Sequence, residues 1–177
     1  MIRRSHLFLA SLAVMMGSAG AASAARVDFF RAALCQPTWT ADSIRAVNGA
    51  AAKVATPTFS GSMVLFHLPK PISRDGFTTQ DVMLGSHLNG VLIDGKVAAD
   101  LARRYDLEPE NAGGVGFARQ LPDSQQKWKD QGLAFIVARE REEGNTLLAC
   151  EFVANDELEI REDVQRARSE NEKTSDP

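Results

Sequence analysis

The two cysteines of the chain, Cys35 and Cys150, are the first side chains to consider for chemistry, because a thiolate is both a nucleophile and a metal ligand. Neither has a histidine in its local sequence, and no C-x-x-C motif is present. In an oxidising compartment an even cysteine count is typical of a disulfide. The sequence therefore predicts a structural bridge between Cys35 and Cys150, worth about 4–5 kcal/mol. A free thiol, catalysis and metal binding are the alternatives.

Histidines are the second source of chemistry. His67 and His87 lie in predicted strands, and no paired ligand spacing accompanies them. If those strands pair, the two imidazoles could converge with a carboxylate and form a metal site or an acid/base centre. The available carboxylates are Asp75, Asp81 and Asp94. Without such convergence, both are ordinary strand histidines, and we expect no catalytic residue, metal or cofactor.

The segment "HLPKPISRDGF" is the best candidate for contact with a partner. Two prolines stiffen it, which lowers the entropy lost when a loop is immobilised against another molecule, and binding residues often lie on such loops. The sequence therefore predicts a possible partner-binding loop, with a plain connector as the alternative. The residues expected to contribute are Pro69, Lys70, Pro71, Arg74 and Phe77.

Residues 1–25 have the pattern of a secretory signal peptide. Arg3 and Arg4 precede the apolar run "LFLASLAVMM", and Ala22-Ser23-Ala24 fits the A-x-A cleavage pattern. The apolar run is too short to cross a bilayer. We therefore expect cleavage near residue 24 or 25, no stable membrane anchor, and a protein released into a bacterial periplasm or secreted.

Charge excludes two classes of partner. The chain has 20 basic and 23 acidic residues, a net charge of −3. Loss of the leader with its two arginines would make the net charge −5, because 18 bases then face 23 acids. No basic stripe is present that could neutralise nucleic-acid phosphates. An acidic protein is also not attracted to an anionic membrane surface.

Helical patterns recur along the body of the chain. Asp28 is expected to cap a short helix that begins at Phe29, and a second helix is expected from residue 40 or 41 to 54. A third is predicted from Val97 to Tyr105, with Asp94 as its cap. The segment 122–132 reads as a polar helix anchored by Trp128.

Strand patterns lie at 62–69, on both sides of a turn at Asn89-Gly90, at 115–121, and in a hairpin formed by 133–142 and 146–154. Strand 62–69 is apolar on both faces, so we expect it to be central. In the last hairpin, alternation places Phe135 and Val137 beside Cys150 on the core face.

The predicted fold class is α+β: an antiparallel sheet of about five strands with helices packed on one face and one disulfide. A single domain is expected over residues 26–155, and residues 156–177 form a charged tail that is partly helical or disordered. With no assembled catalytic motif, the sequence favours a non-catalytic binding or inhibitor module of the periplasm or the secreted fraction. It would recognise another protein or a component of the cell envelope. The alternative is a small hydrolase or metal-dependent enzyme that uses His67 and His87.

Overall fold

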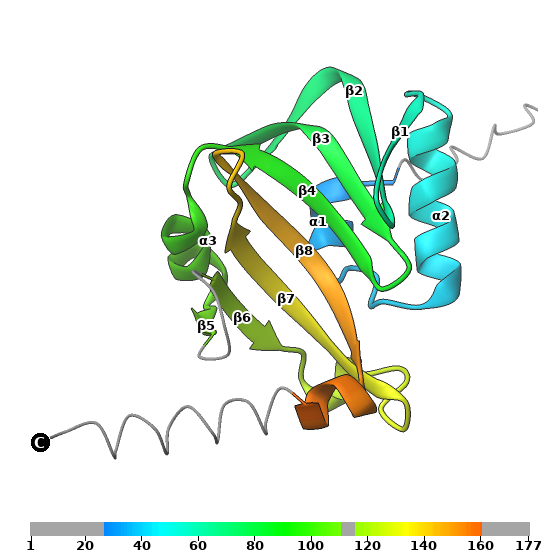
Figure 1. Cartoon of the computed structure of the whole chain (residues 1–177), viewed down its shortest axis with the longest axis vertical. Coiled ribbons are helices and arrows are strands. Elements are labelled where there is room, and N and C mark those ends of the chain that lie inside the picture. Colours follow the sequence, from blue (N-terminus) through cyan, green and yellow to red (C-terminus); the bar gives the residue numbers. More distant parts are fainter. Residues whose placement is uncertain (1–26, 111–115, 161–177) are drawn as a thin grey trace, which may run out of the picture.

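The computed structural model describes residues 27–110 and 116–160, which contain one eight-stranded sheet (Figure 1). All neighbouring strands are antiparallel, in the order β1-β2-β3-β4-β8-β7-β6-β5. The strands are β1 (Pro57–Ser60), β2 (Met63–Arg74), β3 (Phe77–Gly85), β4 (Leu88–Asp94), β5 (Glu108–Pro109), β6 (Gly116–Gln120), β7 (Gly132–Glu140) and β8 (Asn145–Ala154). The labelled helices are α1 (Phe29–Ala33), α2 (Ala41–Ala52), α3 (Ala98–Tyr105) and the 3₁₀ turn η1 (Asp123–Gln125), and residues 155–160 are also helical.

Mixed helix and antiparallel sheet is therefore the observed fold class, but the expectation of about five strands is wrong. The two outermost strands, β1 and β5, have four and two residues, and each begins or ends with a proline. Such short strands are defined by their pairing partner rather than by their own apolar pattern. The expected central strand, β2, is second from one edge, and β4 and β8 occupy the middle of the sheet.

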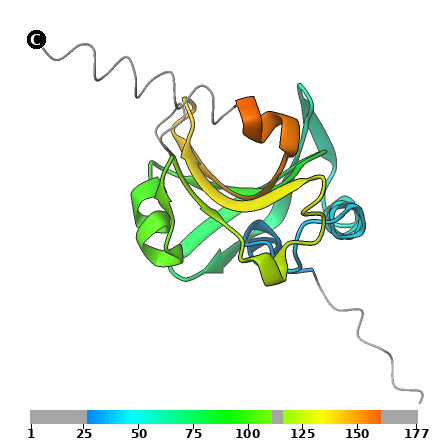
Figure 2. The ribbon, with the colours of Figure 1, turned by 90° about the horizontal axis from the view of Figure 1, so that it is seen from below.

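One face of the sheet carries the main core and the helices. Alternate residues of the strands, among them Phe66, Val82, Val91 and Leu148, join residues of α1, α2 and α3 in a helix-side cluster. α1 packs on β4 and β8, α2 on β2, β3 and β4, and α3 on β6, β7 and β8. Figure 2 shows that β7 and β8 curve strongly, with α1 on their convex side.

The opposite face carries a second, smaller cluster. It consists of Met83, Leu88, Leu92, Val137, Leu147 and Ala149, with Met63, Leu65, Ala118 and Phe135 packed against it. Ile136, rather than its neighbours, lies opposite Cys150 in the ladder. The expected placement of Phe135 and Val137 on the helix side is therefore wrong, because the register differs by one residue and each shift of one reverses the face. The inward position of Cys150 is correct.

The hairpin between β3 and β4 turns at Ser86 and His87, not at Asn89-Gly90. Asn89 and Gly90 lie within β4 and are buried. A Cβ atom at Gly90 would lie 2.8 Å from Leu147 Cδ1 and 2.9 Å from Ala149 Cβ. Glycine is needed here because β8 approaches closely, and not because a turn requires positive φ.

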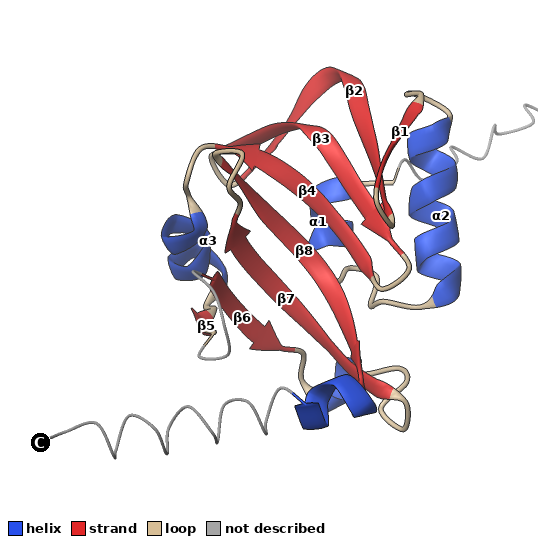
Figure 3. Ribbon diagram, in the orientation of Figure 1, coloured by secondary structure: helices blue, strands red, loops and turns tan. Residues whose placement is uncertain are grey.

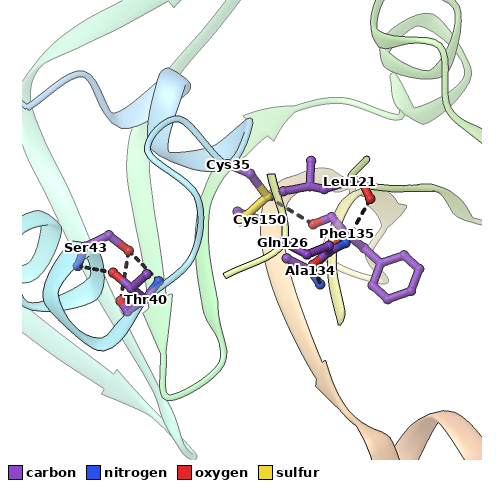
Figure 4. Close-up of a disulfide and its surroundings, with 8 residues drawn as sticks. All are labelled: Cys35, Thr40, Ser43, Leu121, Gln126, Ala134, Phe135 and Cys150. Carbon is purple, nitrogen blue, oxygen red and sulfur yellow. Dashed lines mark hydrogen bonds between the residues drawn. A yellow bond between two sulfur atoms is a disulfide. The ribbon is translucent and has the colours of Figure 1, made fainter. Parts of the chain in front are cut away.

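The disulfide joins Cys35, just after α1, to Cys150 in β8, with 4.8 Å between the two Cα atoms and a sequence separation of 115 (Figure 4). Cys35 Sγ also lies 3.4 Å from the carbonyl oxygen of Phe135 in β7. The bridge therefore fastens the first helix to the centre of the sheet. A disulfide is compatible with an extracellular location.

Two of the helices drawn in Figure 3 begin where the sequence analysis predicts, and two other helix predictions are wrong in part. Asp28 caps α1 as expected, and Thr40 caps α2 in a reciprocal arrangement with Ser43. Asp94 does not cap α3; instead the hydroxyl of Thr146 accepts from the Val97 N–H and donates to the Gly95 carbonyl. The polar helix expected at 122–132 is reduced to η1.

Trp128, the expected anchor of that helix, instead packs edge-on against Trp39, with ring centroids 5.1 Å apart.

None of the helices in 27–110 and 116–160 combines the length and apolar character needed to span a membrane. The expected signal peptide and the tail beyond residue 160 lie outside the described residues, and residues 155–160 form a helical turn. In Figure 2 that turn lies on the concave side of β7 and β8.

Candidate functional site

The predicted partner-binding loop is not a loop, because its residues form the end of β2 and the start of β3. β1 covers β2 only as far as the Pro57–Phe66 pair, so the rest of β2 has no outer neighbour among the described residues. The ladder with β3 is also irregular between His67 and Ile72. Proline, which lacks an N–H, is tolerated at such an edge. Pro69, Lys70 and Pro71 are all exposed there.

The tip of this hairpin is held by contacts within the chain. Arg74 donates to Asp28 at the start of α1 over 2.6 Å. Asp75 accepts from the Arg104 guanidinium at 2.7 Å and from the Tyr105 hydroxyl at 3.0 Å. The rings of Phe77 and Tyr105 have centroids 6.4 Å apart. Arg74 and Phe77 are therefore engaged internally, and the part of the predicted loop that remains available is Pro69 to Pro71.

The electrostatics of the tip agree with this geometry. The hydrogen bonds from Arg104 and Tyr105 hold the pKa of Asp75 below its usual value of 3.8. Burial and the bond to Asp75 together raise the pKa of Tyr105 to about 12. Both shifts favour the form present at neutral pH, in which an ionised carboxylate accepts from a neutral phenol.

β1, next to this segment, carries a feature that the sequence did not indicate. Three large apolar side chains are exposed among the described residues: Val54 at 47%, Phe59 at 75% and Ile160 at 63%. Phe59 is the most exposed of them, and every residue of β1 is exposed. Its partner in the ladder is Val64 of β2. The segment "TPTFSGS" contains turn-forming residues on both sides of Phe59, so its pattern gives no sign of an edge strand.

Two cations lie beyond the Pro57 end of the exposed strand. Lys53 ends α2 a few residues before β1, and Lys70 lies four residues beyond Phe66 along β2. Both side chains are exposed, and neither forms an ion pair with the described residues. We call Lys53, Val54, Phe59 and Lys70 the β1 surface.

The two histidines have different neighbours. His67 Nδ1 lies 2.8 Å from Asp81 Oδ1, its partner across the β2–β3 ladder. His87 lies in the β3–β4 turn, 6.3 Å from the Trp39 ring and 6.5 Å from the Phe152 ring. The strand from Asp81 to Gly85 alone spans about 13 Å. The two imidazoles are therefore not brought together.

Of the three carboxylates considered for such a centre, only Asp81 meets a histidine. In 27–110 and 116–160, no group of three or more His, Cys, Asp or Glu side chains is placed to hold a metal ion.

At the other edge of the sheet, a partly buried ion network joins three elements. The Arg139 guanidinium of β7 donates to Glu110, which follows β5, at 2.6 and 2.7 Å, and to Glu151 of β8 at 2.8 and 3.1 Å. Burial opposes the charge on Arg139, but the bonds to the two carboxylates outweigh it and raise its pKa. A guanidinium whose N–H groups are bonded to two carboxylates of the same chain has a structural role, because it joins the elements that carry them.

Comparisons with protein-family models, with curated proteins and with solved structures found no match for this chain. Its function must therefore be inferred from its own residues.

Proposed function

We propose that this protein is a non-catalytic binding module of the bacterial periplasm or the secreted fraction, which recognises an extended, acidic segment of another exported protein. The main observation is the exposure of Phe59, an aromatic side chain that is 75% exposed on a strand with one pairing partner among the described residues. The location rests on the leader pattern of residues 1–25 and is supported by the disulfide between Cys35 and Cys150.

An open strand edge presents unpaired N–H and C=O groups to which an extended peptide can add as a further strand. Natural proteins usually protect such an edge with charges, bulges or a covering element. β1 has no charged residue, and its proline stands at the first position. The backbone of Thr58 to Ser60 is therefore able to pair with another chain.

Charge selects the partner. Lys53 and Lys70 both lie beyond the Pro57 end of β1 without carboxylate partners in the described part of the chain, and the nearby Asp81 is already engaged by His67. A partner strand with glutamate or aspartate at the end that lies beside Pro57 would neutralise both lysines. Alternate apolar side chains on its inner face would cover Phe59 and Val54. Burial of one phenylalanine side chain contributes about 1.5–3 kcal/mol.

The test uses a short capped peptide in which valine alternates with glutamate, labelled for fluorescence anisotropy and titrated with the mature protein. We expect saturable binding that weakens with salt. Phe59→Ser is expected to weaken it about tenfold. Lys70→Gln is expected to reduce the salt dependence. Ile160→Ser, which removes another large exposed apolar side chain away from β1, is the matched control and leaves the affinity unchanged.

Three outcomes contradict the proposal. The first is the absence of saturable binding by the valine–glutamate peptide. The second is equal affinity for a peptide that alternates valine with lysine. The third is self-association of the protein that Phe59→Ser abolishes, because β1 would then pair with a second copy of itself rather than with another protein.

A further inference from the structure

We propose that the groove between α1 and α2 binds a small aliphatic carboxylate, with the Arg31 guanidinium as the anion-binding group. The groove has a volume of about 660 Å³, within the range of small-molecule sites. Asp28, Arg31, Ala32 and Cys35 line it from α1 and its C-terminal end, and Ser43 and Ala46 line it from α2. It shares no residue with the β1 surface, so this site goes beyond the proposed function.

The groove exists because two helices rest on the sheet and face each other with small side chains. α1 packs on β4 and β8, whereas α2 packs on β2, β3 and β4. Ser43, Ala46 and Val47 share one face of α2, at the i, i+3 and i+4 spacing. Opposite them, Ala32 contributes only a methyl group. Neither helix therefore fills the space between them.

The disulfide makes one wall rigid. Cys35 lines the groove and is bonded to Cys150 at the centre of the sheet. α2 is fixed at its start by the reciprocal hydrogen bonds of Thr40 and Ser43, drawn in Figure 4. A site held on preformed walls loses little entropy on binding.

The polar groups of the groove favour an anion. Asp28 is fully engaged, because one carboxylate oxygen accepts from the Arg31 N–H and the other from the Arg74 guanidinium. By contrast, the Arg31 side chain forms no ion pair with the described residues, and its contact is the Gln36 amide oxygen at 3.4 Å. A guanidinium in this state is a strong and bidentate partner for a carboxylate.

An aliphatic body suits the rest of the groove better than a peptide. The hydroxyl of Ser43 is used by Thr40, and the amide oxygen of Gln36 is used by Arg31. These groups are then not available to the N–H and C=O groups of a peptide backbone. The methyl groups of Ala32 and Ala46, with Val47, remain for contact with a hydrocarbon chain.

Octanoate is the probe, titrated into the mature protein by calorimetry, with octanol and octylammonium as neutral and cationic comparators. We expect one octanoate per chain and binding of octylammonium that is weaker by about tenfold or more. Arg31→Gln should weaken octanoate about tenfold and leave octanol unchanged. The cap of α1 is kept, because Asp28 binds the backbone N–H of residue 31 and not its side chain.

Two further variants test the position of the site. Ala46→Leu places a larger side chain in the groove from an exposed position of a helix that leucine favours, and it should abolish binding of octanoate and octanol alike. Arg45→Gln removes the same charge from a neighbouring residue that does not line the groove, and it should have no effect. The valine–glutamate peptide should bind all three variants as it binds the parent protein.

The inference is overturned if octanoate does not bind saturably, if it binds Arg31→Gln as tightly as the parent, or if Ala46→Leu leaves its affinity intact. Failure of the peptide experiment alone would contradict the proposed function and leave this site supported. Unfolding curves of each variant show whether a loss of binding follows from a loss of fold.

Discussion

The two edges of the sheet are both short strands, yet they are closed to different degrees. β5 contributes only Glu108 and Pro109, and the next residue, Glu110, is tied through Arg139 to Glu151 near the middle of the sheet. β1 contributes four uncharged residues, one of which is an exposed phenylalanine. One edge has a charge, a proline and an ion network, which are devices that prevent further pairing. The other edge, β1, has only the proline at its first position.

The difference separates structural charge from charge that is available to a partner. Arg139 is mostly buried, and its two carboxylates belong to the same chain, so nothing outside the protein is needed to neutralise it. Lys53 and Lys70 are exposed, with no ion pair in the described part of the chain. An acidic partner therefore gains most at the β1 edge.

Breaking the ion network of the closed edge should cost more stability than removing Phe59 from the open edge. Arg139→Met removes the guanidinium that Glu110 and Glu151 share, and the free energy of unfolding should fall by about 2–4 kcal/mol, because partly buried carboxylates lose their counter-charge. Urea unfolding followed by tryptophan fluorescence measures it. Arg141→Met is the control: it removes the pair with Glu143 in the turn and should cost less than about 1 kcal/mol. Equal losses of stability in the two variants would show that the ion network stabilises the fold no more than an ion pair in a turn does.

A second prediction concerns the tip of the β2–β3 hairpin, where contacts with α3 close the edge of the sheet again. Beyond Phe66, β2 is itself the outermost strand, and the Asp75 contacts hold its tip against α3. Tyr105 is the only tyrosine of the chain, so its ionisation can be followed by absorbance alone. It should titrate at about 12 rather than 10. In Asp75→Asn its pKa should move back toward 10, because the carboxylate no longer favours the neutral phenol.

The signs of the pH effects follow from the directions of the two shifts. Because folding raises the pKa of Tyr105, its contribution to stability is complete below pH 10 and is lost as the pH rises toward about 12. Because folding lowers the pKa of Asp75, its contribution is complete above the usual carboxyl value and is lost as the pH falls through the lowered one. Asp100→Asn, on the same helix but paired with Arg103, should leave the Tyr105 titration unchanged.

Sequence patterns located the parts of this fold that are set locally. The cap at Asp28 and the helix after Thr40 depend on neighbours within a few residues, and the β7–β8 hairpin joins two consecutive strands through one short turn. The disulfide could also be predicted, because two cysteines allow one intramolecular pairing. The number of strands could not be predicted from the sequence, because β1 and β5 are strands only by virtue of their pairing with β2 and β6. The face of Phe135 depends on a register between two strands, and one residue of error reverses it.

The candidate sites could be predicted from the sequence to a smaller extent than the fold. The exposure of Lys70 between two prolines agrees with the stiff segment expected there, but Arg74 and Phe77 of that segment are occupied by α1 and α3. The exposure of Phe59 could not be predicted from the sequence, because it depends on β1 being the outermost strand of the sheet that the described residues form. The groove could not be predicted from the sequence either, because small side chains such as those of Ala32 and Ala46 are typical of close contacts between helices.

The smallest effect on stability is expected at the open edge. Phe59 buries little against its own chain, so Phe59→Ser should change the free energy of unfolding by no more than about 0.5 kcal/mol. Phe66 on the adjacent strand is 1% exposed, and Phe66→Ala should cost about 3–5 kcal/mol in the same urea assay. An exposed aromatic side chain that adds nothing to folding lowers solubility, and under the proposed function contact with another molecule would offset that cost. A destabilisation by Phe59→Ser close to that of Phe66→Ala would show that Phe59 belongs to the core, and the β1 surface would lose its main argument.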